Sequence, residues 1–163
     1  MTFGYEKYNA DVISKTDKKR ICCYFVVSDL HKITPACLRL RAEELVDEIE
    51  RHEDWILESV IWDANHKVDT DREGLNTILN KAENNDFDIL LLHHVGIISR
   101  QVTKSFDYAL ELVKMDKVVY GIIDEIHSFD DLARKLPLTK SSRKQYEDYK
   151  CVNNDLGGTN EDK

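Results

Sequence analysis

The hydrophobic residues of the chain gather in four short runs, each followed by a segment in which they recur at helical spacing. The four runs are rich in aromatic and β-branched residues and predict buried strands at 21–27, 55–62, 87–92 and 118–123. The segments after them carry apolar residues three or four positions apart and predict helices at 35–52, 71–84, 102–115 and 129–136. This alternation predicts a three-layer α/β fold, with a mostly parallel sheet of four to five strands, helices on both faces and right-handed crossovers.

Polar residues and prolines fit the ends of these elements. Thr34 and Pro35 suit an N-cap and the first position of a helix, and Thr70 or Asp71 suits the cap of the second helix. Pro137 interrupts the chain after the fourth helix. Three of the four predicted helices therefore have a start or stop signal that agrees with their hydrophobic spacing.

Length and composition fit a single domain with added ends. The chain has 163 residues and 42% hydrophobic content, enough for one buried core. We expect a polar N-terminal arm at 1–19, the domain at 20–137, and a C-terminal part at 138–163. That last part contains a short predicted helix at 141–150 and a tail whose Asn- and Gly-rich composition predicts disorder.

Charge and cysteine content limit the partners and the setting. The formal net charge of -8 argues against a protein that coats nucleic acid, so contact with DNA would be local, weak or assisted by a partner. The four cysteines lack metal-ligand spacing and follow no apolar signal segment, which predicts a reduced, cytoplasmic setting. No apolar run approaches the ~20 residues that cross a bilayer, so no membrane association is expected.

A site should lie where the parallel strands end, because loops and helix N-termini converge at that edge. A polar residue at this edge that has no part in a site is a loop residue exposed to solvent. The candidates in chain order are Ser28, Asp29, His31, Asp63, His66, Lys67, His93, His94, Ser99, Arg100, Asp124, Glu125 and His127.

Several familiar chemistries do not fit these residues. The first strand is followed by Ser-Asp-Leu-His rather than by a glycine-rich phosphate loop, which excludes dinucleotide and P-loop sites. His93 and His94 are adjacent and would point to opposite sides of an extended segment, so they do not suit one metal ion. Cys22 and Cys23 lie inside a strand and are expected to fill core volume.

Three segments together resemble a known family. They are "YFVVS" (24–28), "TDREGL" (70–75) and "LLLHHVGIISR" (90–100), and in this order and spacing they resemble the N-terminal catalytic domain of serine recombinases, which include resolvases, invertases and large integrases. The family's motifs are a strand ending Tyr-x-Arg-Val-Ser, then Asp-Arg-x-Gly-Leu at a helix start, then Leu-Asp-Arg-Leu-x-Arg after a strand. The resemblance covers about 20–125 and implies a resolvase-like fold.

The resemblance also implies a chemistry. Serine recombinases break and rejoin DNA through a covalent phosphoserine intermediate, without a metal or other cofactor, in site-specific recombination and mobile-element integration. By motif position Ser28 matches the nucleophile, and Arg72, Lys81 and Arg100 match cations of the family. Such cations stabilise the charge on the pentacoordinate phosphate.

The chain departs from the family at three motif positions. Val26 stands where the family has arginine, and Gly96 and Ile97 stand where it has aspartate and arginine. A positioned arginine in phosphoryl transfer accelerates the reaction by ~10³ to 10⁵. DNA cleavage by this chain is therefore expected to be impaired.

Three hypotheses follow. The first is a serine-recombinase-type domain that exchanges DNA strands, as a homo-oligomer or with a recombinase partner, because no DNA-binding pattern follows the domain. The alternative is a non-catalytic resolvase-like interaction or regulatory module that acts with a partner recombinase. The third is an unrelated α/β module that binds a small ligand near His93 and His94.

Overall fold

A computed structural model of the chain describes residues 3–27, 34–64 and 72–161, and the side chains of these residues apart from Cys37 and those after Asn153. Five strands form one sheet in the order β1-β3-β2-β4-β5. β2 is parallel to β3 and to β4, β4 is parallel to β5, and β1 alone is antiparallel. The strands are β1 (Phe3–Lys7), β2 (Lys19–Val27), β3 (Trp55–Ala64), β4 (Ile89–Leu92) and β5 (Val118–Gly121).

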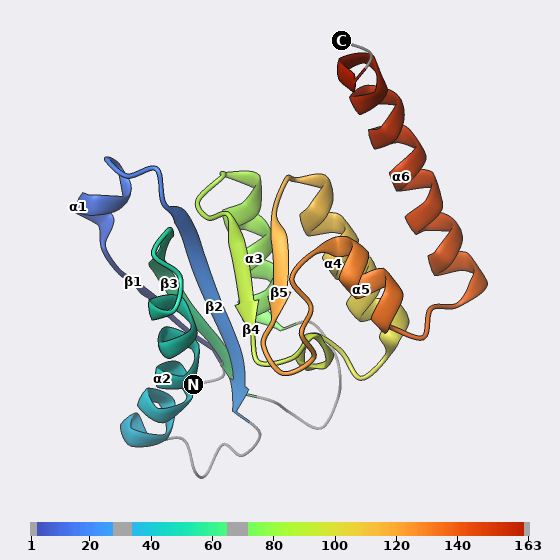
Figure 1. The fold of residues 1–163 in the computed structure, drawn as a ribbon. Coiled ribbons are helices and arrows are strands. Elements are labelled where there is room, and N and C mark those ends of the chain that lie inside the picture. Colours follow the sequence, from blue (N-terminus) through green and yellow to red (C-terminus); the bar gives the residue numbers. More distant parts are fainter. Residues whose placement is uncertain (1–2, 28–33, 65–71, 162–163) are drawn as a thin grey trace.

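Helices cover both faces of this sheet, so the predicted three-layer, mostly parallel α/β fold is confirmed (Figure 1). α2 packs on one face, while α3, α4 and α5 pack on the other. The helical segments are α1 (Ala10–Ile13), α2 (Pro35–Glu50), α3 (Glu73–Glu83), the 3₁₀ turn η2 (Val95–Ile97), α4 (Val102–Lys114), α5 (Phe129–Lys135) and α6 (Lys140–Glu161). In the part of the chain described, no helix has both the length and the apolar character needed to span a bilayer.

The central strand β2 is buried on both faces because its residues alternate between two cores. Cys22 and Tyr24 belong to the core beneath α3 and α4, whereas Cys23 and Phe25 belong to the core beneath α2. Both cysteines are fully buried and free, which confirms their predicted role as small core residues.

The segment expected as an N-terminal arm at 1–19 contains a strand. Here β1 adds an antiparallel edge strand to β3, with Gly4 opposite Trp62. A Cβ atom at Gly4 would lie 1.9 Å from a ring carbon of Trp62, so only glycine allows the indole to lie across this strand. Tyr5 is also bound, because its hydroxyl accepts a hydrogen bond of 2.7 Å from Lys81 on α3. These long-range contacts order a segment that has no hydrophobic period of its own.

The C-terminal helix is longer than the predicted one at 141–150. α6 begins at Lys140, after the break at Pro137, and continues to Glu161 through the Asn- and Gly-rich residues. Each glycine within a helix costs about 1 kcal/mol relative to alanine, which disfavours but does not prevent a helix. Tyr146 and Tyr149 of α6 pack against Phe129 at the start of α5.

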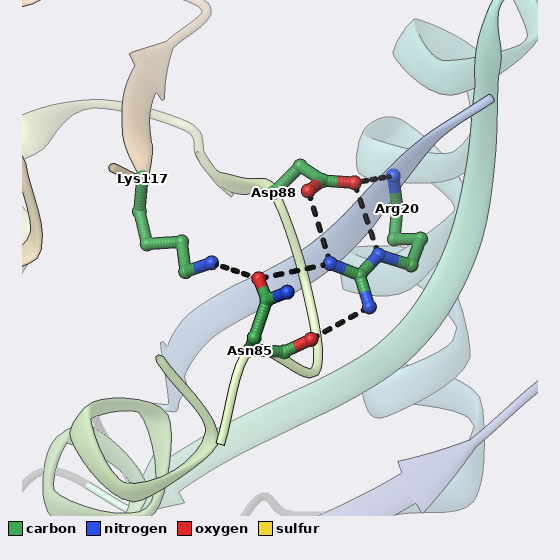
Figure 2. Close-up of polar contacts among 4 residues, drawn as sticks. All are labelled: Arg20, Asn85, Asp88 and Lys117. Carbon is green, nitrogen blue, oxygen red and sulfur yellow. Dashed lines mark hydrogen bonds and ion pairs between the residues drawn. The ribbon is translucent and has the colours of Figure 1, made fainter. Parts of the chain in front are cut away.

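The amino ends of the parallel strands are joined by a polar cluster (Figure 2). Arg20 at the start of β2 forms two side-chain hydrogen bonds of 3.0 Å with Asp88, just before β4, and donates at 2.7 Å to the carbonyl of Asn85. Lys117, just before β5, donates to the Asn85 side chain at 2.5 Å. Burial lowers the pKa of Lys117. This cluster fastens three strand starts to one another at the edge opposite the expected site.

The strand order determines where a site can lie. From β2 the chain crosses to β3 on one side, and from β3 it crosses to β4 on the other side of β2. α2 and α3, which make these two crossovers, accordingly lie on opposite faces of the sheet (Figure 1). The carboxyl ends of β2 and β4 therefore flank a topological switch point, where open α/β sheets bind their ligands.

Candidate functional site

The predicted nucleophile directly follows β2 in the sequence. Ser28 comes after Val27, the last residue of β2, which pairs with Ala64 at the end of β3. Ser28 lies outside the described residues, as do the other early candidates Asp29, His31, His66, Lys67 and Asp71. The described part of the site therefore consists of the groups around the ends of β3 and β4 and the start of α3.

Arg72 is the cation that links two of the three motif segments. It directly precedes α3, is partly buried, and donates a hydrogen bond from its guanidinium to the carbonyl oxygen of Ile97 in η2. The guanidinium also interacts with the hydroxyl of Tyr24 on β2. Arg72 thus lies between the central strand, the start of α3 and the turn after β4.

Asp63 positions the start of α3, a role that the sequence did not reveal. Its carboxylate is 2% exposed and accepts hydrogen bonds from the Tyr24 hydroxyl at 2.7 Å and from the Gly74 backbone N–H at 2.9 Å. A Cβ atom at Gly74 would lie 2.4 Å from an Asp63 oxygen. The glycine therefore allows a carboxylate on β3 to approach the first turn of α3.

This arrangement differs from the expected helix cap. Thr70 or Asp71 was predicted to cap α3, but the N-cap residue is Arg72, with extended backbone and no side-chain cap bond. The orphan N–H of Gly74 is satisfied by Asp63, eleven residues earlier in the chain. Burial, followed by the neighbouring Asp63 carboxylate, raises the pKa of the Tyr24 hydroxyl, so Tyr24 remains a neutral donor to that carboxylate.

Lys81 does not lie beside Arg72. It is nine residues further along α3, which is about 13 Å at the rise of an α-helix. Its ammonium is buried and donates to Glu58 on β3 and to Tyr5 on β1, both at 2.7 Å. Burial alone would lower the pKa of Lys81, but the hydrogen bonds that it donates to these two partners raise it overall. The structure thus places Lys81 in a buried ion pair that holds β1 and α3 against β3.

Arg100 lies between η2 and α4 and is exposed. It comes three residues after Ile97, whose carbonyl accepts a hydrogen bond from Arg72. The preceding Ser99 is buried, and its hydroxyl accepts a 3.0 Å hydrogen bond from the N–H of Gln101 next to α4. Ser99 thus helps to fix the start of α4, and Arg100 projects from this fixed turn.

Other residues at this edge have structural contacts. The Asp124 carboxylate accepts a 2.9 Å hydrogen bond from the N–H of Val95 and so fixes the start of η2. His93 Nε2 lies 2.6 Å from a carboxylate oxygen of Glu44 on α2, without hydrogen-bonding geometry. Within the described ranges, no group of three or more His, Cys, Asp or Glu residues is arranged to hold a metal ion.

The three positions at which the chain departs from the family motifs lie on β2 and in η2. Val26 is on the same face of β2 as Tyr24 and packs against the core beneath α3. Ile97 supplies the carbonyl that binds Arg72, and Gly96 precedes it in η2. These positions therefore lie on two elements that contact Arg72, β2 through Tyr24 and η2 through Ile97.

Comparisons with known proteins show what this fold resembles. No family model and no curated protein matches the chain. Among solved structures, the N-terminal catalytic domain of TP901-1 integrase matches with a TM-score of 0.56 and 19% identity, over 66% of this chain and 80% of that one. The C-terminal catalytic domain of ISC1926 TnpA, an IS607-like serine recombinase, matches with a TM-score of 0.55 and 16% identity, over 71% and 75%.

A third match extends over most of the chain. A resolvase family site-specific recombinase from Streptococcus pneumoniae matches with a TM-score of 0.56 and 12% identity, over 89% of this chain and 98% of that one. At such identities the likeness concerns the fold. The protein therefore has the resolvase-like fold of serine recombinase catalytic domains, as the three motif segments predicted.

Proposed function

We propose that this chain is a serine-recombinase-type domain that acts on DNA in strand exchange or mobile-element integration, with slow strand cleavage of its own. One observation carries the proposal: Arg72 is held by Tyr24 and the Ile97 carbonyl at the switch point of a resolvase-like sheet. The related structures include an integrase and a site-specific recombinase, which supports the same class of reaction.

In the proposed reaction the Ser28 hydroxyl oxygen attacks a DNA phosphorus atom. A bond forms between this oxygen and the 5′ phosphate, the bond to the 3′ oxygen breaks, the serine loses its proton, and the departing 3′ oxygen gains one. Arg72 and Arg100 stabilise the negative charge of the pentacoordinate phosphate. No metal or other cofactor takes part in this scheme.

The rate should be low because positive charge has been lost from the site. Val26 and Ile97 replace two arginines of the family pattern. An arginine that stabilises phosphoryl transfer contributes about 4 to 7 kcal/mol, which corresponds to ~10³ to 10⁵ in rate. The rate that remains depends on Ser28, on Arg72 before α3 and on Arg100 before α4.

A second candidate function rests on the same substitutions and on the net charge of -8. In this alternative the chain is a non-catalytic module that joins a partner recombinase and regulates it, either within a hetero-oligomer or by competing for the partner's interface. It predicts that no covalent DNA complex forms under any condition, and that the chain changes the activity of a complete recombinase added to it.

The two functions are separated by trapping the covalent intermediate. Duplex DNA with a nick near the cleavage position loses the short end fragment after attack, so a phosphoserine complex accumulates and migrates as a denaturant-resistant band. The proposal predicts a slowly formed band that protease removes and that Ser28→Ala abolishes, whereas Arg41→Gln, on the exposed side of α2, retains it. A band that persists in Ser28→Ala, or no band in the wild type, contradicts the proposal.

A further inference from the structure

A groove of about 480 Å³ lies on the face of the sheet that α2 covers, apart from the Arg72 neighbourhood. The partly exposed Trp62 forms its floor near the carboxyl end of β3, beside the buried Phe25 of β2. Glu6 and Tyr8 line it on the side of β1, and Leu38 and Arg39 line it on the side of α2. The groove thus opens at the edge of the sheet where the candidate site lies, but on the opposite face from α3.

The accessible part of this floor is the indole of Trp62, because Phe25 beside it is only 2% exposed. Phe25 and Trp62 are register partners on adjacent strands, and their rings are nearly parallel, with an interplanar angle of 10° and centroids 6.1 Å apart. Trp62 extends across Gly4 of β1, where any side chain would collide with the indole. The antiparallel edge strand, which the sequence did not predict, therefore widens this surface.

The walls of the groove supply one cation. Arg39 is exposed on α2, and none of the ion pairs found among the described residues involves it. Glu6 on the facing wall accepts a hydrogen bond from the Tyr8 hydroxyl, and this contact raises the pKa of Tyr8 to about 12. Tyr8 is therefore neutral near pH 7, and Arg39 is the cation among the residues that line the groove.

We infer that this groove binds one unpaired nucleotide of a DNA strand, with the base stacked on Trp62 and its phosphate bound by Arg39. A planar π system with a negative charge matches an aromatic floor beside a guanidinium, and bases of any sequence stack in this way. The volume suits a ligand of this size. The assignment to a DNA strand, and not to a free nucleotide, rests on the proposed function. The groove lies near the carboxyl ends of the strands, where cleavage is proposed.

The indole provides a direct assay. The chain has two tryptophans, and Trp55 is buried among His52 and Tyr120, away from the groove, so Trp55→Phe leaves Trp62 as the single reporter. A single-stranded oligodeoxynucleotide should quench this fluorescence and bind at least about tenfold more tightly than the same sequence as a duplex, because only an unpaired base can stack.

Substitutions of arginine test the phosphate contact. Arg39→Gln should make the slope of log K against log salt less steep by about 0.7, the value for one phosphate contact to a single strand. Arg39→Glu should weaken DNA binding further. Because the Arg39 side chain is exposed, neither substitution should change the free energy of unfolding by more than about 0.5 kcal/mol. Arg41→Gln, two residues along the same helix and outside the groove, is the matched control and should leave the slope unchanged.

The fluorescence titration is repeated with Ser28→Ala, which can bind DNA but cannot form the covalent complex. Its results separate nucleotide binding in the groove from the proposed cleavage function. Quenching by single strands without any covalent complex in the wild type retains the nucleotide groove and refutes the cleavage function. No quenching, equal binding of duplex and single strand, or equal salt slopes for Arg39→Gln and Arg41→Gln overturns the nucleotide groove. A mononucleotide that binds as tightly as the oligonucleotide overturns the assignment to a DNA strand.

Discussion

Replacement of Lys81 by methionine should strongly destabilise the protein. Lys81 and Glu58 are 4% and 6% exposed, and the ammonium donates to both Glu58 and Tyr5 at 2.7 Å. Removing one partner of a buried ion pair leaves an uncompensated charge and costs about 3–5 kcal/mol. For a chain of this length, 1 kcal/mol shifts the melting temperature by about 2–4 °C, so Lys81→Met should lower it by roughly 6–20 °C.

Urea denaturation followed by circular dichroism measures this effect. The double variant Lys81→Met/Glu58→Leu removes both charges and should recover most of the lost free energy of unfolding, because an apolar pair of similar volume is often as stable as a buried ion pair. Lys104→Met, on the exposed side of α4, is the matched control and should change the free energy of unfolding by less than about 0.5 kcal/mol.

The ion pair also predicts a dependence on alkaline pH. The partners Glu58 and Tyr5 raise the pKa of Lys81 above its ordinary value of 10.5 despite burial, which lowers it. The stabilisation is therefore complete below pH 10.5 and is lost as the pH rises through the pKa of the folded state.

A loss of less than about 1 kcal/mol in Lys81→Met at pH 7, or a double variant as unstable as the sum of both single variants, would refute this reasoning.

Three further predictions concern the helix start and the strand edge. Gly74→Ala should lower the free energy of unfolding in urea by about 1–3 kcal/mol, because its Cβ would lie 2.4 Å from an Asp63 oxygen. Asp63→Ala should also destabilise the protein by about 1–3 kcal/mol, since it leaves the buried Tyr24 hydroxyl and the Gly74 N–H without an acceptor. The double variant Asp63→Ala/Tyr24→Phe should lose less free energy of unfolding than the two single variants together. Burial raises the pKa of Asp88, but hydrogen bonds from Arg20 lower it overall, so this stabilisation is present above pH 3.8 and is lost as the pH falls through the folded pKa. Melting temperatures at acidic pH should therefore fall less steeply for Asp88→Asn than for the wild type.

The central strands could be predicted from the sequence because they are buried on both faces. Such strands appear as continuous apolar runs, and the predicted run at 21–27 lies within the observed β2 (Lys19–Val27). β1 could not be predicted in this way, because it is a short edge strand fixed by Lys81, 76 residues away in the sequence. Contacts of this kind stabilise a segment without leaving a local pattern in it.

The three motif segments predicted the resolvase-like fold, whereas the gathering of Ser28, Arg72 and Arg100 around one phosphate stays a prediction. Arg72 binds the carbonyl of Ile97 in η2, and Arg100 follows Ile97 by three residues in the sequence. The motif segments did not predict that Asp63 would replace the local cap of α3, or that Lys81 would pair with Glu58. A motif position gives the residue type, whereas the partner of a buried charge depends on which strand lies beside it.

The central claim is that Ser28 cleaves DNA slowly because Val26 and Ile97 stand where the family has arginine. The most direct test puts arginine back at both positions. Val26 lies on the Arg72 side of β2, and Ile97 is the residue whose carbonyl binds Arg72, so Val26→Arg/Ile97→Arg would add two cations to the same neighbourhood. We predict that the double variant forms the covalent DNA complex on nicked substrates at least ~10³-fold faster than the wild type, and only when Ser28 is present. A double variant that remains folded but forms no Ser28-dependent complex would contradict the account.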